Sequence, residues 1–447
     1  MAQTPVNQRV HPPGEADFVR AGKLVSSTTV SGPSATVVGA VDPLRDAAAG
    51  TEDRAADESL GKQFIDALDL ATWTSGERLG ELSARLEREV EIAARYESAM
   101  APKVLSLLRA SLPTAPDRSR ESGVYDLTPD VVEAACRNIL FNGNVEACDG
   151  TRIVVHTLPV TVVQIGICLT SYVGTGDGGS IVQRLFRHDI TRRTDDAEAQ
   201  VRDFISQRAR RSRRTSTEIG DDGQPPSLSD MLCRAVMIYG ERAMLADRSD
   251  RPWRLGHGSP MPFEMLVGSG REELTWASLK TLRRLLEEHK KFLFVPSEIS
   301  DQAVRTIANA LRPLQYCVLR NTKDILEGYI TGSSYERPHY KKQGIYQALR
   351  AFQEDVGSKV VLCVFRVSQF SPGGIFYAHE DFVHQAAQIV MADSALQEHR
   401  GFPNLIDIAD RTCRGMFDAG CVAAQVHTVL ARSGAPFQYF DERSTRT

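Results

Sequence analysis

Residues 145–173 read VEACDGTRIVVHTLPVTVVQIGICLTSYV, and this β-rich stretch decides the fold class. A short apolar run, residues 145–148, leads into Asp149-Gly150. A strand that ends in Asp-Gly places one carboxylate at the edge of a sheet, and glycine lets a backbone or a phosphate approach closely. Asp149 is therefore our first candidate for a catalytic residue and metal ligand. Because Asp-Gly is also a common turn, a simple β-turn is the alternative.

Length and composition indicate a globular protein of more than one part. A chain of 447 residues is too long for one compact core, so we expect two domains, or one domain with appendages. The hydrophobic content of 42% and charged content of 25% are ordinary for a soluble globular protein. The net charge of −4 does not mark a nucleic-acid-binding protein, so any basic surface must be local.

The cysteines and the apolar segments favour a soluble, cytoplasmic protein. None of the eight cysteines forms a CxxC motif, which excludes a zinc knuckle and favours buried, reduced thiols. No secretory signal pattern opens the chain, and no run approaches 18 apolar residues, so we expect no membrane segment. The motif GxxxxGK[ST] does not occur either, so the chain carries no P-loop of its own.

The sequence divides into three parts. Residues 1–60, rich in Ala, Pro, Ser, Thr, Gly and Asp, predict a flexible N-terminal arm. Residues 61–125 predict a helical extension, whose apolar stripe runs from Leu79 to Met100 before Pro102 ends or kinks the helix. We expect this stripe to pack on the protein's own core; a helical hairpin or a second subunit could cover it instead. The main domain is expected over 126–447.

Alternating strands and helices predict the architecture of the main domain. Strands are expected at 152–158, 160–173 and 179–189, and a helix from residue 227 or 229 to about 246. Further helices near 273–290, 299–312 and 381–399 alternate with strands near 291–296, 315–320, 359–368 and 374–379, and residues 404–432 look helical. This pattern predicts an α/β fold in which helices flank a mixed sheet.

Three more side chains could join Asp149 in a site. Hydrolysis of a phosphodiester by divalent metals needs carboxylates that converge from separate elements. Glu241 lies on the helix that ends near residue 246, unless it is merely a solvated helix residue. His257, before Gly258-Ser259, could bind Mn²⁺ or act as a base, or be a turn histidine. Asp410 could supply a carboxylate from the C-terminal helix, or lie exposed beside Arg411 and Arg414.

One dense basic cluster stands out. Five arginines occur within seven residues, at Arg208, Arg210, Arg211, Arg213 and Arg214. Forked guanidinium donors suit phosphate oxygens, so this cluster is our candidate for DNA binding. The alternative is a solvated helix end, where cations are favourable in any case.

The order of these motifs over residues 130–435 resembles that of the NurA family of DNA-end-processing nucleases. In that family an Asp-Gly-Ser is followed by a helical Glu, a second Asp-Gly-Ser/Pro and a Tyr-Pro-x-x-Leu-(Ile)-x-x-Ala-His segment. Asp149 and Glu241 match the first two acidic positions. His257, Phe402 and Asp410 replace the second Asp, the Tyr and the His, so the resemblance supports the fold more strongly than the chemistry.

The resemblance implies a ribonuclease-H-like sheet and Mn²⁺-dependent (or Mg²⁺-dependent) cleavage of DNA ends. It also implies a homodimer that works with a HerA-type hexameric ATPase in DNA-end resection or antiphage defence. The metal ligands would be Asp149, Glu241 and Asp410, and His257 would be a further catalytic residue. Asp410 and His257 would have exchanged roles, so that the aspartate supplies a ligand and the histidine a nitrogen. Two alternatives stay open: a catalytically degenerate scaffold that docks on the ATPase ring and guides DNA, and a hydrolase of free nucleotides or other phosphoesters.

Overall fold

The computed structural model describes residues 68–73, 79–115, 118–157, 159–174, 182–192, 198, 230–342 and 344–434. The chain divides into two compact units, Met1–Glu87 and Arg88–Thr447, and the sheet and the candidate site belong to the second. The predicted arm over 1–60 and the arginine cluster over 208–214 lie outside the described residues. The predicted boundary at residue 126 stays a prediction.

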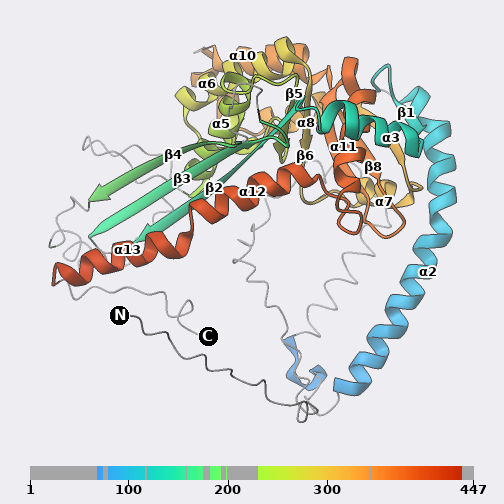
Figure 1. The fold of residues 1–447 in the computed structure, drawn as a ribbon, viewed down its shortest axis with the longest axis horizontal. Helices are drawn as coiled ribbons and strands as arrows, with labels where there is room; N and C mark the ends of the chain where they lie inside the picture. Colours follow the sequence, from blue (N-terminus) through green and yellow to red (C-terminus); the bar gives the residue numbers. More distant parts are fainter. Residues whose placement is uncertain are drawn as a thin grey trace, which may run out of the picture. The chain divides into compact units, whose positions relative to one another are not determined.

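A nine-stranded mixed sheet forms the centre of the second unit (Figure 1). Its order is β1-β7-β8-β9-β6-β5-β2-β3-β4. Strands β2, β5 and β6 run parallel to one another, whereas the other neighbours pair antiparallel. These three adjacent strands therefore point towards the same edge, where β5 and β6 end. The strands are β1 (Gly123–Asp126), β2 (Val145–His156), β3 (Val160–Thr170), β4 (Val182–Arg192), β5 (Trp253–His257), β6 (Phe292–Val295), β7 (Gln315–Asn321), β8 (Val360–Arg366) and β9 (Gly374–His379).

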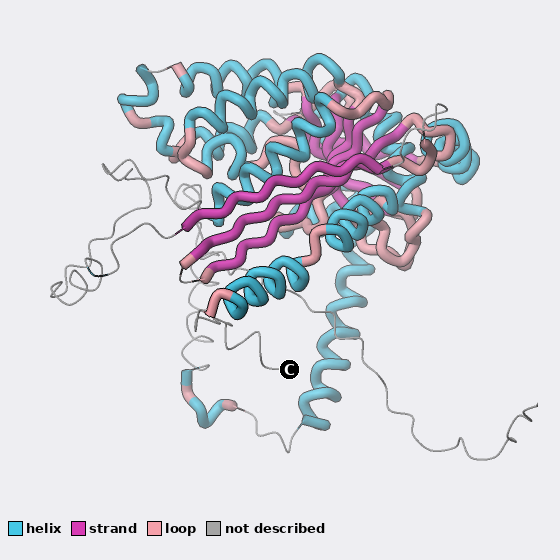
Figure 2. Tube along the Cα trace, turned by 60° about the vertical axis from the view of Figure 1, so that its left-hand side comes forward, coloured by secondary structure: helices cyan, strands magenta, loops and turns pink. Residues whose placement is uncertain are grey.

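Helices cover both faces of this sheet (Figures 1 and 2). Helices α5 (Asp230–Asp247), α6 (Glu272–Leu282), α8 (Lys323–Ile330) and α10 (Ile345–Phe352) bury one face. Helices α3 (Pro129–Ala135), α11 (Val383–Ala395) and α12 (Asn404–Met416) bury the other. The predicted α/β class, a mixed sheet flanked by helices with an N-terminal helical extension, is confirmed.

The other elements among the described residues are α2 (Leu79–Ser111), α7 (Gln302–Ala310), α9 (Pro338–Lys342), α13 (Ala419–Arg432) and eight short helical turns. These turns are η2 (Leu70–Thr72), η4 (Leu112–Thr114), η5 (Cys136–Leu140), η6 (Glu264–Gly268), η7 (Arg283–His289), η8 (Ser334–Glu336), η9 (Gln353–Gly357) and η10 (Glu380–Phe382), with a single helical residue at 68. Among the described helices, none has the length and apolar character needed to cross a bilayer.

Strand β2 does not end at Asp149-Gly150, so that expectation is wrong. The strand continues to His156 because its antiparallel pairing with β3 runs on from Ala147 to His156. What ends here is the pairing on the other side, since the last partners of β2 and β5 are Cys148 and Gly256. Asp149 therefore lies where β2 loses one neighbour, which leaves its side chain at a break in the sheet.

Helix α2 corrects two expectations about the N-terminal extension. Of the two effects expected of Pro102, an end or a kink of the helix, the end is wrong, because Pro102 lies inside α2 (Leu79–Ser111). The turns that follow are held by packing, because Leu105 and Leu108 are buried against residues of α7 such as Ala308. The earlier part of the stripe is not packed on the core, since Val90 and Tyr96 are exposed.

Candidate active site

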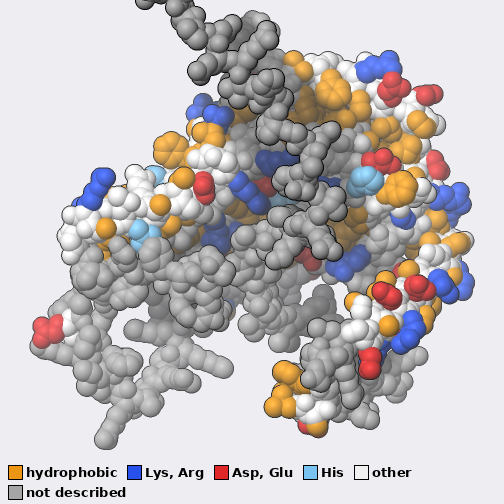
Figure 3. All heavy atoms as spheres, turned by 60° about the horizontal axis from the view of Figure 1, so that its bottom comes forward, with side chains coloured by type: hydrophobic (Ala, Val, Ile, Leu, Met, Phe, Trp, Pro, Cys, Tyr) orange, Lys and Arg blue, Asp and Glu red, His pale blue; other side chains and the backbone are white. Residues whose placement is uncertain are grey.

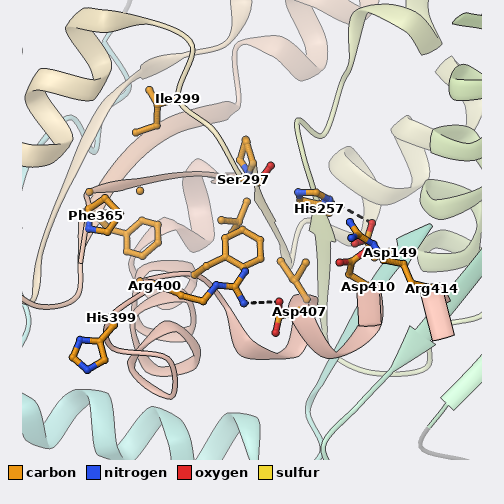
Figure 4. A pocket seen from close by; sticks show the side chains of 18 residues that line it. Asp149, His257, Ser297, Ile299, Phe365, His399, Arg400, Asp407, Asp410 and Arg414 are labelled. Carbon is orange, nitrogen blue, oxygen red and sulfur yellow. Dashed lines mark hydrogen bonds and ion pairs between the residues drawn. The ribbon is translucent and has the colours of Figure 1, made fainter. Parts of the chain in front are cut away.

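A cleft of about 430 Å³ opens at the carboxyl ends of β5 and β6, beside Asp149 of β2 (Figure 4). Asp149 of β2, His257 of β5 and Val295 to Ser297 after β6 line one side. Open α/β sheets bind ligands outside the carboxyl ends of their strands, where neighbouring connections diverge. The rest of the lining comes from β8, β9, the loop before α12 and α12 itself: Ile299, Phe365, Pro372, Gly373, Gly374, His399, Arg400, Gly401, Phe402, Ile406, Asp407, Asp410 and Arg414.

Asp149 and His257 are in contact in the cleft. The Nδ1 atom of His257 lies 3.4 Å from Oδ1 of Asp149, which also accepts a hydrogen bond of 2.9 Å from the backbone N–H of Gly150. Burial alone would lower the pKa of His257, but the hydrogen bond and charge of Asp149, with the charge of Glu241, outweigh it and raise that pKa. The pair therefore favours an imidazolium beside a carboxylate.

Asp410 lies at the same end of the cleft as Asp149 (Figure 4). It is on α12, and its Oδ1 accepts a hydrogen bond of 2.7 Å from Nε of Arg414. Burial and the nearby charge of Asp149 raise the pKa of Asp410, against the opposing effect of Arg414. Arg411 bonds Asp407 instead, so the two arginines beside Asp410 have different partners.

Glu241 approaches the site from the opposite face of β2. It is buried on α5, and a Cβ placed on Gly150 would lie 2.6 Å from its Oε1. Successive strand residues point to opposite faces, so Gly150 faces α5 while Asp149 faces α12. The room left by glycine is filled by Glu241 and Met237, and not by a backbone or a phosphate as expected. Burial raises the pKa of Glu241, which Arg242 opposes and Asp149 reinforces.

Arg242 was missed by the sequence reasoning. Its side chain is buried, pairs with the Glu241 carboxylate, and lies over the Phe294 ring at 4.8 Å. Its Nη2 donates to the carbonyl oxygens of His257 and Ser259 at 2.9 and 2.5 Å. Arg242 thus holds the end of β5 that carries His257. The available signal was its position, because it falls on the apolar stripe of α5 between residues 238 and 245.

Phe402 packs, as expected for a residue without a hydroxyl. Its ring meets that of His257 edge-on, with centroids 6.0 Å apart, and lines the cleft. The Arg400 guanidinium lies 5.9 Å from the same ring and also bonds Asp407 at 2.6 Å. An aromatic ring and two cations, Arg400 and Arg414, therefore border the carboxylates.

The donor chemistry of the cleft suits a divalent ion. Asp149 and Asp410 offer carboxylate oxygens and His257 a ring nitrogen, a set that Mn²⁺ accepts more readily than Mg²⁺ does. Within the described parts of the chain, however, no three such side chains stand ready as a metal-binding group. Asp410 is engaged by Arg414 and Glu241 by Arg242, so an ion would have to displace these cations.

Comparisons with known proteins yield likeness to solved structures. No family model and no curated protein matches the chain. The NurA nuclease from Sulfolobus solfataricus is 11% identical, with 80% of this chain and 98% of that one covered and a TM-score of 0.43. NurA with manganese is 10% identical, with 67% of this chain and 95% of that one covered and a TM-score of 0.34. NurA bound to dAMP and manganese is 10% identical, with 71% of this chain and 92% of that one covered and a TM-score of 0.32. At these values, the roles of individual residues rest on the geometry of this chain.

Proposed function

We propose that this protein is a metal-dependent nuclease that cleaves DNA at its ends. The observation that carries the proposal is that Asp149, His257 and Asp410 line one cleft, in which Asp149 and His257 are in contact. The order of motifs, which resembles that of NurA nucleases, supports DNA as the substrate.

Asp149 and Asp410 are the proposed metal ligands, and Glu241 lies behind β2 as a supporting acid. A bound Mn²⁺ or Mg²⁺ would polarise the phosphoryl group and lower the pKa of bound water. The protein's own contribution is to fix the carboxylates. Burial of Asp149 and the hydrogen bond from Gly150 N–H restrict that side chain to one orientation.

His257 and Arg414 are the proposed proton-transferring and phosphate-binding groups. The raised pKa of His257 favours its protonated form, which can donate a proton to a leaving oxygen. The Arg414 side chain is 72% exposed, so its guanidinium can turn from Asp410 to a phosphate oxygen. The arginines at 208–214 remain candidates for contact with the DNA backbone.

A separate motor is the proposed partner. The chain has no P-loop, and a net charge of −4 gives it little long-range attraction for DNA. We therefore propose a cytoplasmic homodimer that docks on a HerA-type hexameric ATPase, in DNA-end resection or antiphage defence. Co-expression with such an ATPase and size-exclusion chromatography with light scattering test this, and separate elution of the two proteins would contradict it.

A catalytically degenerate scaffold is the second candidate. It is favoured by the two ion pairs, Asp410–Arg414 and Glu241–Arg242, which occupy carboxylates that a hard metal would need. Such a subunit would guide DNA on the ATPase ring without cutting it.

Metal titration with DNA cleavage as the readout separates the two candidates. Linear DNA is incubated with wild type and Asp149→Ala over a range of Mn²⁺ and Mg²⁺ concentrations. The nuclease proposal predicts that wild type cleaves DNA and that Asp149→Ala does not. Asp355→Ala is the control, because Asp355 is an exposed acid paired with Arg283, and it should cut at the wild-type rate. Absence of cleavage in every metal supports the scaffold, and hydrolysis of free nucleotides alone would contradict both.

A further inference from the structure

We propose that the exposed face of β4 binds single-stranded DNA and leads it towards Asp149. This β4 face consists of the side chains on the α12 side of the strand: Arg184, Phe186, His188, Ile190 and Arg192. That the bound strand is led to a nuclease site rests on the proposed function. The binding of single-stranded DNA to the β4 face does not.

The register of the sheet connects the β4 face to the cleft. Asp149 pairs with Cys168, and Cys168 pairs with Arg184. Directly opposite residues share a face of the sheet, so these three side chains form one row. Neighbouring strands lie about 4.8 Å apart, which puts the Cα atoms of Asp149 and Arg184 about 10 Å apart.

Helix α12 lies beside this row of side chains. Its Asp410 and Cys413 face the cleft and the buried Cys168, and Phe417 follows directly after the helix. A Cβ on Gly166 would lie 2.0 Å from the Phe417 ring, which shows how closely that ring covers β3. The Phe417 ring is also 6.0 Å from that of Phe186. Strands β2 to β4 and the helix lie side by side in both views (Figures 1 and 2).

The chemistry of the β4 face fits a nucleic acid. Phe186 is 66% exposed, the basic side chains of Arg184, His188 and Arg192 flank it, and none of the five residues of the β4 face is an acid. The acid of this strand, Asp189, lies on the other face, where it bonds Arg187 at 2.6 Å. Elsewhere basic, acidic and apolar side chains are interspersed, as Figure 3 shows for one view.

A single strand suits this face better than a duplex or a second copy of the protein. An exposed ring beside arginines binds unpaired bases by stacking while the cations contact the phosphates. Bases inside a duplex do not offer their faces to such a ring. A symmetric contact between two β4 faces would bring arginines against arginines, which is unfavourable.

The two faces of β4 supply variants and matched controls. Binding of a fluorescent oligothymidine is measured by anisotropy in EDTA, so that no metal chemistry takes part. Arg184→Gln and Phe186→Ala change the β4 face, whereas Arg187→Gln and Leu185→Ala make similar changes on the opposite face. The proposal predicts that the first pair weakens binding by on the order of tenfold each, since a stacked base or a phosphate contact is lost. The second pair should bind within about twofold of wild type, and Arg184→Gln should lower the salt slope by about 0.7.

Three outcomes would overturn the proposal. The first is that wild type does not bind the oligonucleotide. The second is that all four variants, shown to be folded by circular dichroism, bind it with the same affinity. The third is that Phe186→Ala changes the sedimentation of the protein without changing DNA binding, which indicates a protein contact. The failure of the nuclease proposal looks different. In that case the β4 variants still weaken binding, but wild type cuts no DNA in any metal.

Discussion

The Nδ1 atom of His257 lies 3.4 Å from Oδ1 of Asp149, at the point where the parallel pairing of β2 with β5 stops. The contact joins the first acidic position of the site to the position where the NurA motif would have a second aspartate. A nitrogen donor in that place changes both the charge of the cleft and its response to pH.

The Asp149–His257 pair should make stability depend on pH. The pKa of His257 is raised in the folded protein, from an unfolded value of about 6.5. The pair therefore stabilises the fold fully below about pH 6, and this contribution is lost as the pH rises through the folded pKa. We expect His257→Asn to lower the free energy of unfolding by about 0.5–1 kcal/mol at acid pH, because the imidazole is partly exposed, and by less at pH 9. Urea unfolding at both pH values checks this, and an equal loss at both would contradict it.

A carboxylate in place of His257 should strengthen metal binding at a cost in stability. His257→Asp would set two carboxylates side by side, which hard metals favour and which repel each other without a metal. We expect a lower melting temperature than wild type in EDTA, and a larger rise on addition of Mn²⁺. His257→Asn is the neutral control. If the melting temperature of His257→Asp does not change on addition of Mn²⁺, the cleft does not bind the ion.

Arg414 should compete with a metal for Asp410. Removal of the guanidinium frees the carboxylate, so Arg414→Gln should raise Mn²⁺ affinity severalfold without DNA, while Asp410→Asn lowers it by about tenfold. Arg411→Gln is a close control, because Arg411 lies on the same helix and bonds Asp407. Calorimetric titration distinguishes the three, and identical affinities would mean that Asp410 is not a ligand.

Arg242 should be a large contributor to stability. Arg242→Met leaves the Glu241 carboxylate buried without its partner, which typically costs about 3–5 kcal/mol. The double variant Arg242→Met/Glu241→Met should recover much of the loss, because no unpaired charge remains. Arg284→Met breaks a more exposed pair with Asp247 and should cost at most about 1 kcal/mol. Equal losses in the single and double variants would argue against a charge effect.

The local patterns predicted the elements well. The helix expected from residue 227 or 229 to about 246 is α5 (Asp230–Asp247), and Thr128 begins α3 by accepting a hydrogen bond from the N–H of Val131. Apolar periodicity and capping are local properties, so a sequence displays them directly.

The arrangement of the site was less accessible from the sequence. Spacing along the chain could nominate Asp149, His257 and Asp410, but their common cleft depends on strand order and on where the β2–β5 pairing stops. The position of Glu241 behind Gly150 and its engagement by Arg242 depend on which way successive strand residues point. Such long-range packing decides which carboxylates are free, and local patterns do not encode it.

Direct measurement of Mn²⁺ binding tests the central claim that Asp149 anchors a divalent metal in this cleft. Free Mn²⁺ is followed by electron paramagnetic resonance during titration of wild type, Asp149→Asn and the control Asp355→Asn, all without DNA. We predict saturable binding to wild type and the control, and a dissociation constant at least about tenfold higher for Asp149→Asn. Wild-type protein that binds no Mn²⁺, or Asp149→Asn protein that binds it as tightly as wild type, would contradict the account.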